Sequence, residues 1–173
     1  GIERLFAENE VLGLAAMHTT GQGRGMSQSG SGTNALDRGL EAVAGSWQAL
    51  QRVPSGAVWE QTFGTEKVSL EKTYRAMPLG VALVVASASF PAWNVYPAVF
   101  ANLMAGNPVI VKPHPTSVLQ MALAGRILRA TLADAGFSPD LVQLATDTVA
   151  EPITSILATH RDVRIVDFTG SQR

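Results

Sequence analysis

The feature that most constrains the fold is an alternation of short apolar runs with helical stretches that begins near Leu79. The apolar runs lack a polar/apolar alternation, which is typical of parallel strands covered on both faces. The stretches between them are long enough for right-handed crossovers between neighbouring parallel strands. The sequence therefore predicts an α/β fold with a partial, doubly wound parallel sheet, with strands at 80–87, 107–112, 141–146 and 163–171 and helices at 92–106, 116–136 and 150–160.

The part of the chain before this alternation has a different character. Residues 2–23 are compatible with a helix that ends in a glycine-rich turn, and residues 21–34 have almost no apolar content, which predicts a loop. Residues 35–51 carry one apolar stripe at helical spacing, so we expect a helix there.

After Pro54, two alternating segments at 57–63 and 69–76 are separated by 64–67, which predicts an exposed two-stranded ribbon. An isolated ribbon of this kind is marginally stable in water, so we expect it to contact a neighbouring domain or subunit. The predicted organisation is thus a helical segment at 1–54, an oligomerisation-type ribbon at 55–77 and a partial Rossmann-like domain at 78–173.

Composition excludes several classes of function. A formal net charge of −1 and scattered basic residues argue against nucleic acid as a partner. The most continuous apolar run, 81–86, is far shorter than the roughly 20 residues that span a bilayer. With no cysteine in the chain and no two histidines close in sequence, we expect no metal site. We expect a cytoplasmic protein that contacts no membrane.

Polar residues gather where the predicted strands end. In an open parallel sheet, ligands bind beyond the carboxyl ends of the strands, and Lys112 closes the second strand. Its ammonium could hold a ribose hydroxyl or a phosphate, with Pro113 and Pro115 stiffening the exit; the alternative is a solvated lysine at a strand end. His114 is expected to be an exposed loop residue.

The ends of the first and fourth strands carry similar signals. Ser87, Ser89 and Asn94 follow the first strand, although ordinary helix capping would also explain the serines. Gly170 and Ser171 follow the fourth strand, where a glycine permits a close backbone approach and a hydroxyl could bind phosphate; a plain strand-to-helix turn is the alternative.

Residues 30–35, Gly-Ser-Gly-Thr-Asn-Ala, match the dinucleotide pattern G-x-G-x-x-A. That pattern needs a buried strand immediately before it, and residues 19–29 do not provide one. We therefore expect a flexible loop here rather than a phosphate site.

Four motifs in order, PLGV at 78–81, SFP at 89–91, AGNPVIVKP at 105–113 and FTGS at 168–171, resemble the aldehyde dehydrogenase superfamily. The sequence of residues 90–115 is most similar to the branch associated with phenylacetate degradation, which is taken to act on ring-cleavage semialdehydes. The resemblance covers nearly the whole chain but only about a third of such an enzyme, so the chain is expected to be a fragment.

The resemblance implies roles for individual residues. Lys112 matches the lysine that contacts the adenosine ribose of NADP or NAD, and Gly170 and Ser171 match the pair beside the pyrophosphate. Ser89 stands where the family has its oxyanion-hole asparagine, and Pro115 where it has a ribose-binding glutamate. Loss of that glutamate removes a repulsion against a 2′-phosphate, so NADP should be tolerated or preferred. The family's phosphate-proximal glycine is not evident in residues 146–152.

The family's cysteine nucleophile and glutamate base lie beyond residue 171, so this chain alone should be inactive. The resemblance implies a homo-oligomeric NAD(P)-dependent enzyme that oxidises an aldehyde or semialdehyde. Two alternatives stay open: a non-catalytic α/β binding or assembly module that kept the scaffold, and a fragment of an acyl-CoA or acyl-phosphate reductase.

Overall fold

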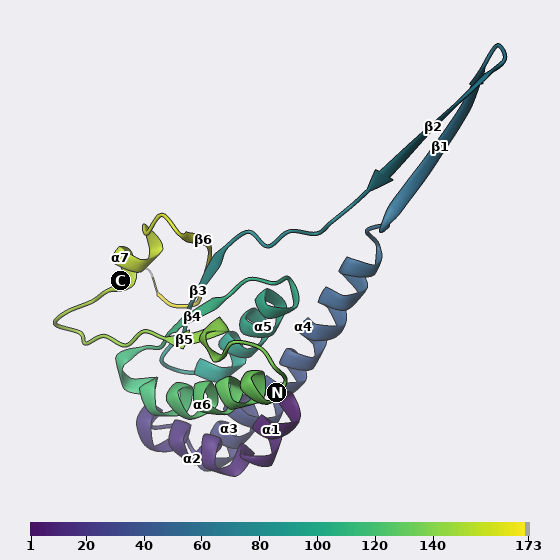
Figure 1. Ribbon diagram of the computed structural model, residues 1–173. Helices are drawn as coiled ribbons and strands as arrows, with labels where there is room; N and C mark the ends of the chain where they lie inside the picture. The colour runs from purple at the N-terminus through teal and green to yellow at the C-terminus, as the bar shows by residue number, and fades with distance from the viewer. Residues whose placement is uncertain (172–173) are drawn as a thin grey trace.

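The computed structural model describes residues 1–171 and contains the predicted α/β architecture. The main sheet is parallel with the order β5-β4-β3-β6, and a separate ribbon projects away from the body (Figure 1). The elements of the sheet region are β3 (Val81–Val85), α5 (Pro91–Met104), β4 (Val109–Lys112), α6 (Val118–Asp134), β5 (Val142–Leu144), α7 (Thr154–Ala158) and β6 (Val163–Phe168).

The two faces of the sheet are covered by different helices. Helices α5 and α6 pack on one face, where Ala82 and Val84 of β3 join Val109 and Val111 of β4 in the core. Helix α7 lies against β3 and β6. This arrangement follows from right-handed crossovers, since the chain moves from β3 outward to β5 and then returns past β3 to β6.

The third crossover differs in extent from the prediction. Strand β5 covers 142–144 rather than 141–146, and α7 covers 154–158 rather than 150–160. Pro152 lacks an amide hydrogen, and the amide of Ile153 donates to Asp147 rather than to a helical carbonyl. Residues 145–153 therefore form a loop.

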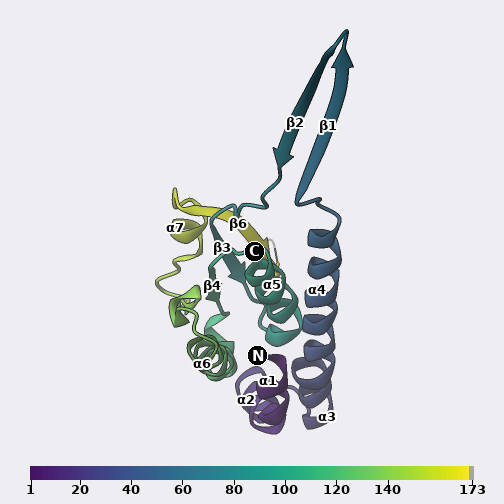
Figure 2. The same ribbon diagram turned by 45° about the vertical axis from the view of Figure 1, so that its right-hand side comes forward.

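The N-terminal helices belong to the same core as the sheet. They are α1 (Ile2–Ala7), α2 (Asn9–Thr20), α3 (Arg24–Gln28) and α4 (Asn34–Gln51). Leu5, Leu12 and Leu36 are buried in one cluster with residues of β3, α5 and α6. Helix α4 runs beside α5, as both ribbon views show (Figures 1 and 2).

The predicted loop at 21–34 is wrong. Only Gly21–Gly23 separates α2 from α3, and a π-helical turn at Ser29–Thr33 then leads directly into α4. Gly30, Ser31 and Gly32 are buried, and the Ser31 carbonyl accepts a hydrogen bond from Gln120 of α6 at 2.9 Å. At residues 30–32 the low hydrophobicity reflects close packing of small residues, whereas residues 23–26 of the same segment are exposed.

The glycines of the 30–35 pattern serve this packing and not a phosphate. A Cβ at position 30 would collide with the ring of Phe90, and one at position 32 would collide with the Asn9 side chain. We expect Gly30→Ala to lower the free energy of unfolding by about 1–3 kcal/mol, because an added methyl in a filled space forces neighbours to shift. Denaturant unfolding would measure this.

Gly25→Ala in α3 is the matched control, because a Cβ there meets nothing within 4 Å. This change should be neutral or slightly stabilising, since alanine is the better helix residue. Equal effects of the two substitutions would contradict the packing role of Gly30.

The predicted ribbon is present with a different turn. Strand β1 (Gly56–Phe63) pairs antiparallel with β2 (Glu66–Thr73), and every residue of both strands is exposed. Only two residues, Gly64 and Thr65, form the turn, and Gly64 has a φ of 63°. The predicted spacer at 64–67 was too long, because Glu66 and Lys67 pair with Phe63 and Thr62 of β1. Strand β2 consequently ends at Thr73, not at 76.

Candidate functional site

A polar cavity of about 650 Å³ lies at the carboxyl ends of the central strands. Strand pairing sets its position, because Val85 of β3 lies opposite both Lys112 of β4 and Phe168 of β6. A smaller cavity of about 270 Å³ beside α5, α6 and β5 is lined mainly by apolar side chains, together with Arg126, Arg129 and Gln143. The polar cavity is lined by Val85, Ala86, Ser87, Ala88, Ser89, Asn94, Lys112, His114, Thr154, Phe168, Thr169, Gly170 and Ser171.

The structure brings most of the predicted site residues together on this cavity. Ser87, Ser89, Lys112, Gly170 and Ser171 all line it. Their gathering follows from the parallel sheet, which places the exits of β3, β4 and β6 on one rim. The roles assigned to them remain predictions.

Pro115 is the predicted residue that does not line the cavity. It begins a short 3-10 helix, Pro115–Ser117, that leads into α6. Proline suits this first helical position because its missing amide hydrogen would have had no partner there.

Lys112 is buried, which excludes the solvated alternative. Its side chain is 8% exposed, and its Nζ lies 2.7 Å from Oδ1 of Asp147, whose side chain is 1% exposed. A buried lysine is expected to have a partner of opposite charge, since an unpaired ammonium in the interior is costly. The site therefore contains a buried ion pair.

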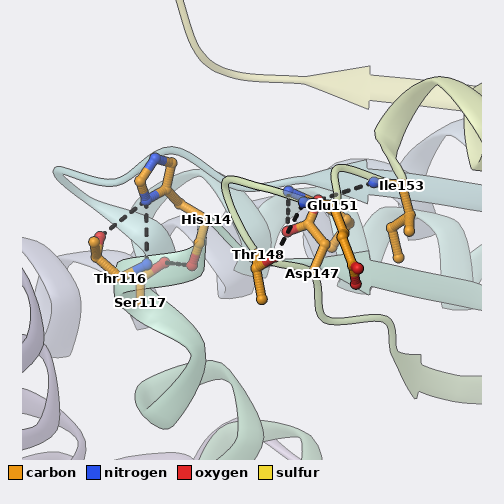
Figure 3. A network of polar contacts seen from close by, with 8 residues as sticks. His114, Thr116, Ser117, Asp147, Thr148, Glu151 and Ile153 are labelled. Carbon is orange, nitrogen blue, oxygen red and sulfur yellow. Dashed lines mark hydrogen bonds and ion pairs between the residues drawn. The ribbon is translucent and has the colours of Figure 1, made fainter.

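Asp147 is the functional candidate that the sequence interpretation missed. It lies in the loop after β5, and its Oδ2 accepts a hydrogen bond from the amide of Ile153 at 3.1 Å (Figure 3). The same loop is braced by a hydrogen bond from the amide of Glu151 to Oγ1 of Thr148. An aspartate shortly after a third parallel strand was the available signal, because that position shares a rim with Lys112.

Two opposing effects act on the pKa of Asp147. Burial by itself raises this pKa, but the Lys112 ammonium, the Ile153 amide and the positive charge of Lys112 lower it by more. The pKa is therefore below its ordinary value, and Asp147 is a carboxylate at neutral pH.

His114 is not the exposed loop residue that was expected. It is half-buried and lines the cavity. Its Nδ1 accepts a hydrogen bond from the backbone amide of Thr116 at 3.3 Å. Because Nδ1 is an acceptor, Nε2 carries the proton of the neutral ring, and Figure 3 shows this nitrogen pointing away from Thr116.

The serines after β3 differ in their surroundings. Ser87 Oγ accepts a hydrogen bond from Nδ2 of Asn94 at 3.3 Å, and the same amide donates to the Phe90 carbonyl. Ser89 is exposed to the cavity and has no hydrogen-bond partner among residues 1–171. Asn94 thus orients the turn, and the Ser89 hydroxyl is free to bind a ligand.

Across the sheet, Gly170 lies against the side chain of Phe168, and its predicted approach to a ligand stays a prediction. A Cβ at this position would lie 2.9 Å from the ring of Phe168.

In the part of the chain that the structure describes, no cluster of three or more acidic, histidine or cysteine side chains could hold a metal ion. No helix within residues 1–171 is both long and apolar enough to cross a bilayer.

Comparison with proteins of known structure gives a close match over this chain. An NAD-dependent aldehyde dehydrogenase from Burkholderia multivorans superposes with a TM-score of 0.93 and 41% identity, over 98% of this chain and 31% of that one. The chain thus spans about a third of that protein's length.

Two curated relatives match over shorter regions. The alpha-ketoglutaric semialdehyde dehydrogenase 2 of Azospirillum brasilense is 35% identical over 97 residues, which are 55% of this chain and 18% of the relative. The gamma-glutamyl phosphate reductase of Leuconostoc citreum is 28% identical over 134 residues, which are 78% of this chain and 32% of the relative. A sequence model of the aldehyde dehydrogenase family matches residues 5–173. The chain belongs to the aldehyde dehydrogenase family.

Proposed function

We propose that this chain forms the first part of the coenzyme-binding region of an NAD(P)-dependent aldehyde dehydrogenase. The single observation that carries the proposal is the buried Lys112, whose side chain reaches a polar cavity at the carboxyl ends of β3, β4 and β6. Ligands of open parallel sheets bind at this edge. The NAD dependence of the Burkholderia multivorans relative supports the choice of cofactor.

The residues of the cavity fit the adenosine and pyrophosphate portions of NAD(P). Lys112 has ammonium protons besides the one directed at Asp147, and these can donate to ribose hydroxyls. Gly170 leaves room for a close backbone approach, and the Ser171 hydroxyl can donate to a pyrophosphate oxygen. When bound, the nicotinamide accepts a hydride from the aldehyde carbon.

Catalysis needs a nucleophile that these residues do not supply, because the chain has no cysteine. We infer that the thiol and the general base come from another part of the enzyme. Ser89 would donate one hydrogen bond to the carbonyl oxygen of the substrate as negative charge develops there. Its side chain is shorter than an asparagine amide, so we expect a weaker contribution.

The proposed substrate is an aldehyde or semialdehyde. The semialdehyde dehydrogenase of Azospirillum brasilense supports this class, and the resemblance of residues 90–115 to the phenylacetate-degradation branch supports a ring-cleavage semialdehyde. We place the enzyme in the cytoplasm. The exposed ribbon supports a homo-oligomer, since Trp59, Phe63 and Leu70 are open to contact with another subunit.

The match to gamma-glutamyl phosphate reductase favours a second candidate, an acyl-phosphate reductase. Both enzymes would bind the cofactor in this cavity, but the dehydrogenase reduces NAD(P) whereas the reductase oxidises NAD(P)H. Assays of the complete protein separate them: aldehyde-dependent formation of NAD(P)H supports the dehydrogenase, and acyl-phosphate-dependent consumption of NAD(P)H supports the reductase.

Cofactor titration of the complete protein tests the binding role. Lys112→Gln keeps a donor toward Asp147 but removes the charge, so we expect affinity for NAD to fall by about ten-fold. Arg161→Gln is the control, because Arg161 is 90% exposed and lies just before β6, at the end away from the cavity. Absence of saturable binding at millimolar cofactor would instead favour a non-catalytic binding module.

A further inference from the structure

The cavity contains a cation whose charge is already neutralised. Lys112 and His114 are the only basic residues that line it within residues 1–171, and no acidic residue lines it there. The Lys112 ammonium is 2.7 Å from the carboxylate of Asp147, which lies outside the cavity wall. The Nδ1 atom of His114 accepts a hydrogen bond from the Thr116 amide, which leaves Nε2 as the donor that this ring can offer to a ligand. The rim therefore offers hydrogen-bond donors but little net positive charge.

We propose that Asp147 makes this site selective for NAD over NADP, by neutralising Lys112 from behind the cavity wall. This inference rests on the proposed function, since it concerns the cofactor of that same cavity. It also reverses the expectation drawn from Pro115, because the carboxylate absent at 115 is supplied from the loop after β5.

The electrostatic reason lies in the difference between the two cofactors. NADP carries a 2′-phosphate dianion where NAD has a hydroxyl. A lone buried lysine would attract that dianion strongly, but a carboxylate in contact with the ammonium largely cancels the attraction. A ribose hydroxyl needs only a donor, which Lys112 still provides through its other protons.

The position of Asp147 is fixed independently of any ligand. Its Oδ1 faces Lys112 and its Oδ2 accepts from the Ile153 amide, while its side chain is only 1% exposed. Both carboxylate oxygens are thus already engaged. Asp147 is accordingly a positioning residue that acts through Lys112.

The test compares the dissociation constants of NAD and NADP for the complete protein by calorimetric titration. The wild type should bind NAD at least about ten-fold more tightly than NADP. Asp147→Asn should move the ratio of the two constants toward NADP by about ten-fold or more, because the Lys112 charge is then free for the phosphate. Asp147→Glu should restore the wild-type ratio.

Two further variants keep the test decisive. Asp140→Asn alters an aspartate paired with Arg129 at 3.1 Å, just before β5 and away from the cavity, and should leave the ratio unchanged. Lys112→Gln combined with Asp147→Asn removes both charges of the buried pair. This double variant should bind both cofactors more weakly and keep the wild-type ratio of their dissociation constants. Because it leaves no unpaired buried charge, it tests the inference even where Asp147→Asn does not fold.

The results that would contradict the proposed function differ from those that would contradict this inference alone. Binding of neither cofactor to the wild type would overturn the proposed function and this inference with it. Saturable binding with equal or tighter affinity for NADP would overturn the inference alone. An equal loss of both affinities in Asp147→Asn would mean that Asp147 only supports the fold, and a selective loss of NADP in the double variant would mean that Lys112 is not neutralised.

Discussion

Replacing Asp147 with alanine is expected to lower the free energy of unfolding by about 3–5 kcal/mol. The substitution leaves the Lys112 ammonium, in a side chain that is 8% exposed, without its partner. It also removes the acceptor for the Ile153 amide, which holds the start of α7. Denaturant unfolding of the protein, followed by tryptophan fluorescence, would measure the loss.

Two further variants test whether the unpaired charge of Lys112 causes this loss of stability. Asp140→Ala removes an exposed partner of Arg129 and should cost no more than about 1 kcal/mol. Lys112→Met combined with Asp147→Leu replaces both buried charges with apolar groups and should recover most of the stability. A double variant as unstable as Asp147→Ala would show that packing, and not an unpaired charge, causes the loss.

The Lys112–Asp147 pair should also make the stability of the protein depend on pH. The pKa of Asp147 is lower in the folded protein than its ordinary value, so folding favours the carboxylate form. Its contribution to stability is fully present above the unfolded pKa of about 3.9 and is lost as the pH falls through the lower folded pKa. The difference in the free energy of unfolding between wild type and Asp147→Ala should therefore be constant near neutral pH and should decrease below about pH 4.

Leu5→Ala is expected to lower the free energy of unfolding of the whole body by about 2–5 kcal/mol. Leu5 of α1 is fully buried and belongs to the cluster that contains the apolar residues of β3 and β4. Deleting its side chain leaves a cavity in the shared core rather than in a separate helical unit. Hydrogen exchange should show weaker protection of amides in β3 as well as in α1.

Leu40→Ala is the matched control, because it makes the same chemical change in α4 at a side chain that is 53% exposed. Its effect should stay within about 0.5 kcal/mol. If Leu5→Ala released only the α1 amides and left β3 protected, the segment at 1–54 would be an independent unit.

The sheet was predictable because its signal is local. Val81–Val85 and residues 109–111 are continuous apolar runs, which are typical of parallel strands that are covered on both faces. The position of Lys112 at the carboxyl end of the central strands then followed from general rules for open α/β sheets. The gathering of Ser87, Ser89 and Gly170 around it followed in the same way.

The errors arose where distant contacts decide the structure. Residues 29–33 have small polar side chains, and only their neighbours Phe90 and Gln120 make them a packed helical turn. The sequence signal for Asp147 was only its place shortly after the third strand, because its partner Lys112 ends β4 and is separated from it in the chain by α6 and β5. His114 was likewise expected to be exposed, although in the structure it is half-buried and hydrogen-bonded to the amide of Thr116.

The buried pair also ties two separate crossovers of the sheet together. Lys112 ends β4, whereas Asp147 lies in the loop after β5, so α6 and β5 lie between the two charges in the chain. The cross-link therefore closes a long chain segment, and ordering such a segment costs chain entropy. The carboxyl edge of the sheet is thus complete only where both the β4 exit and the loop after β5 are in place.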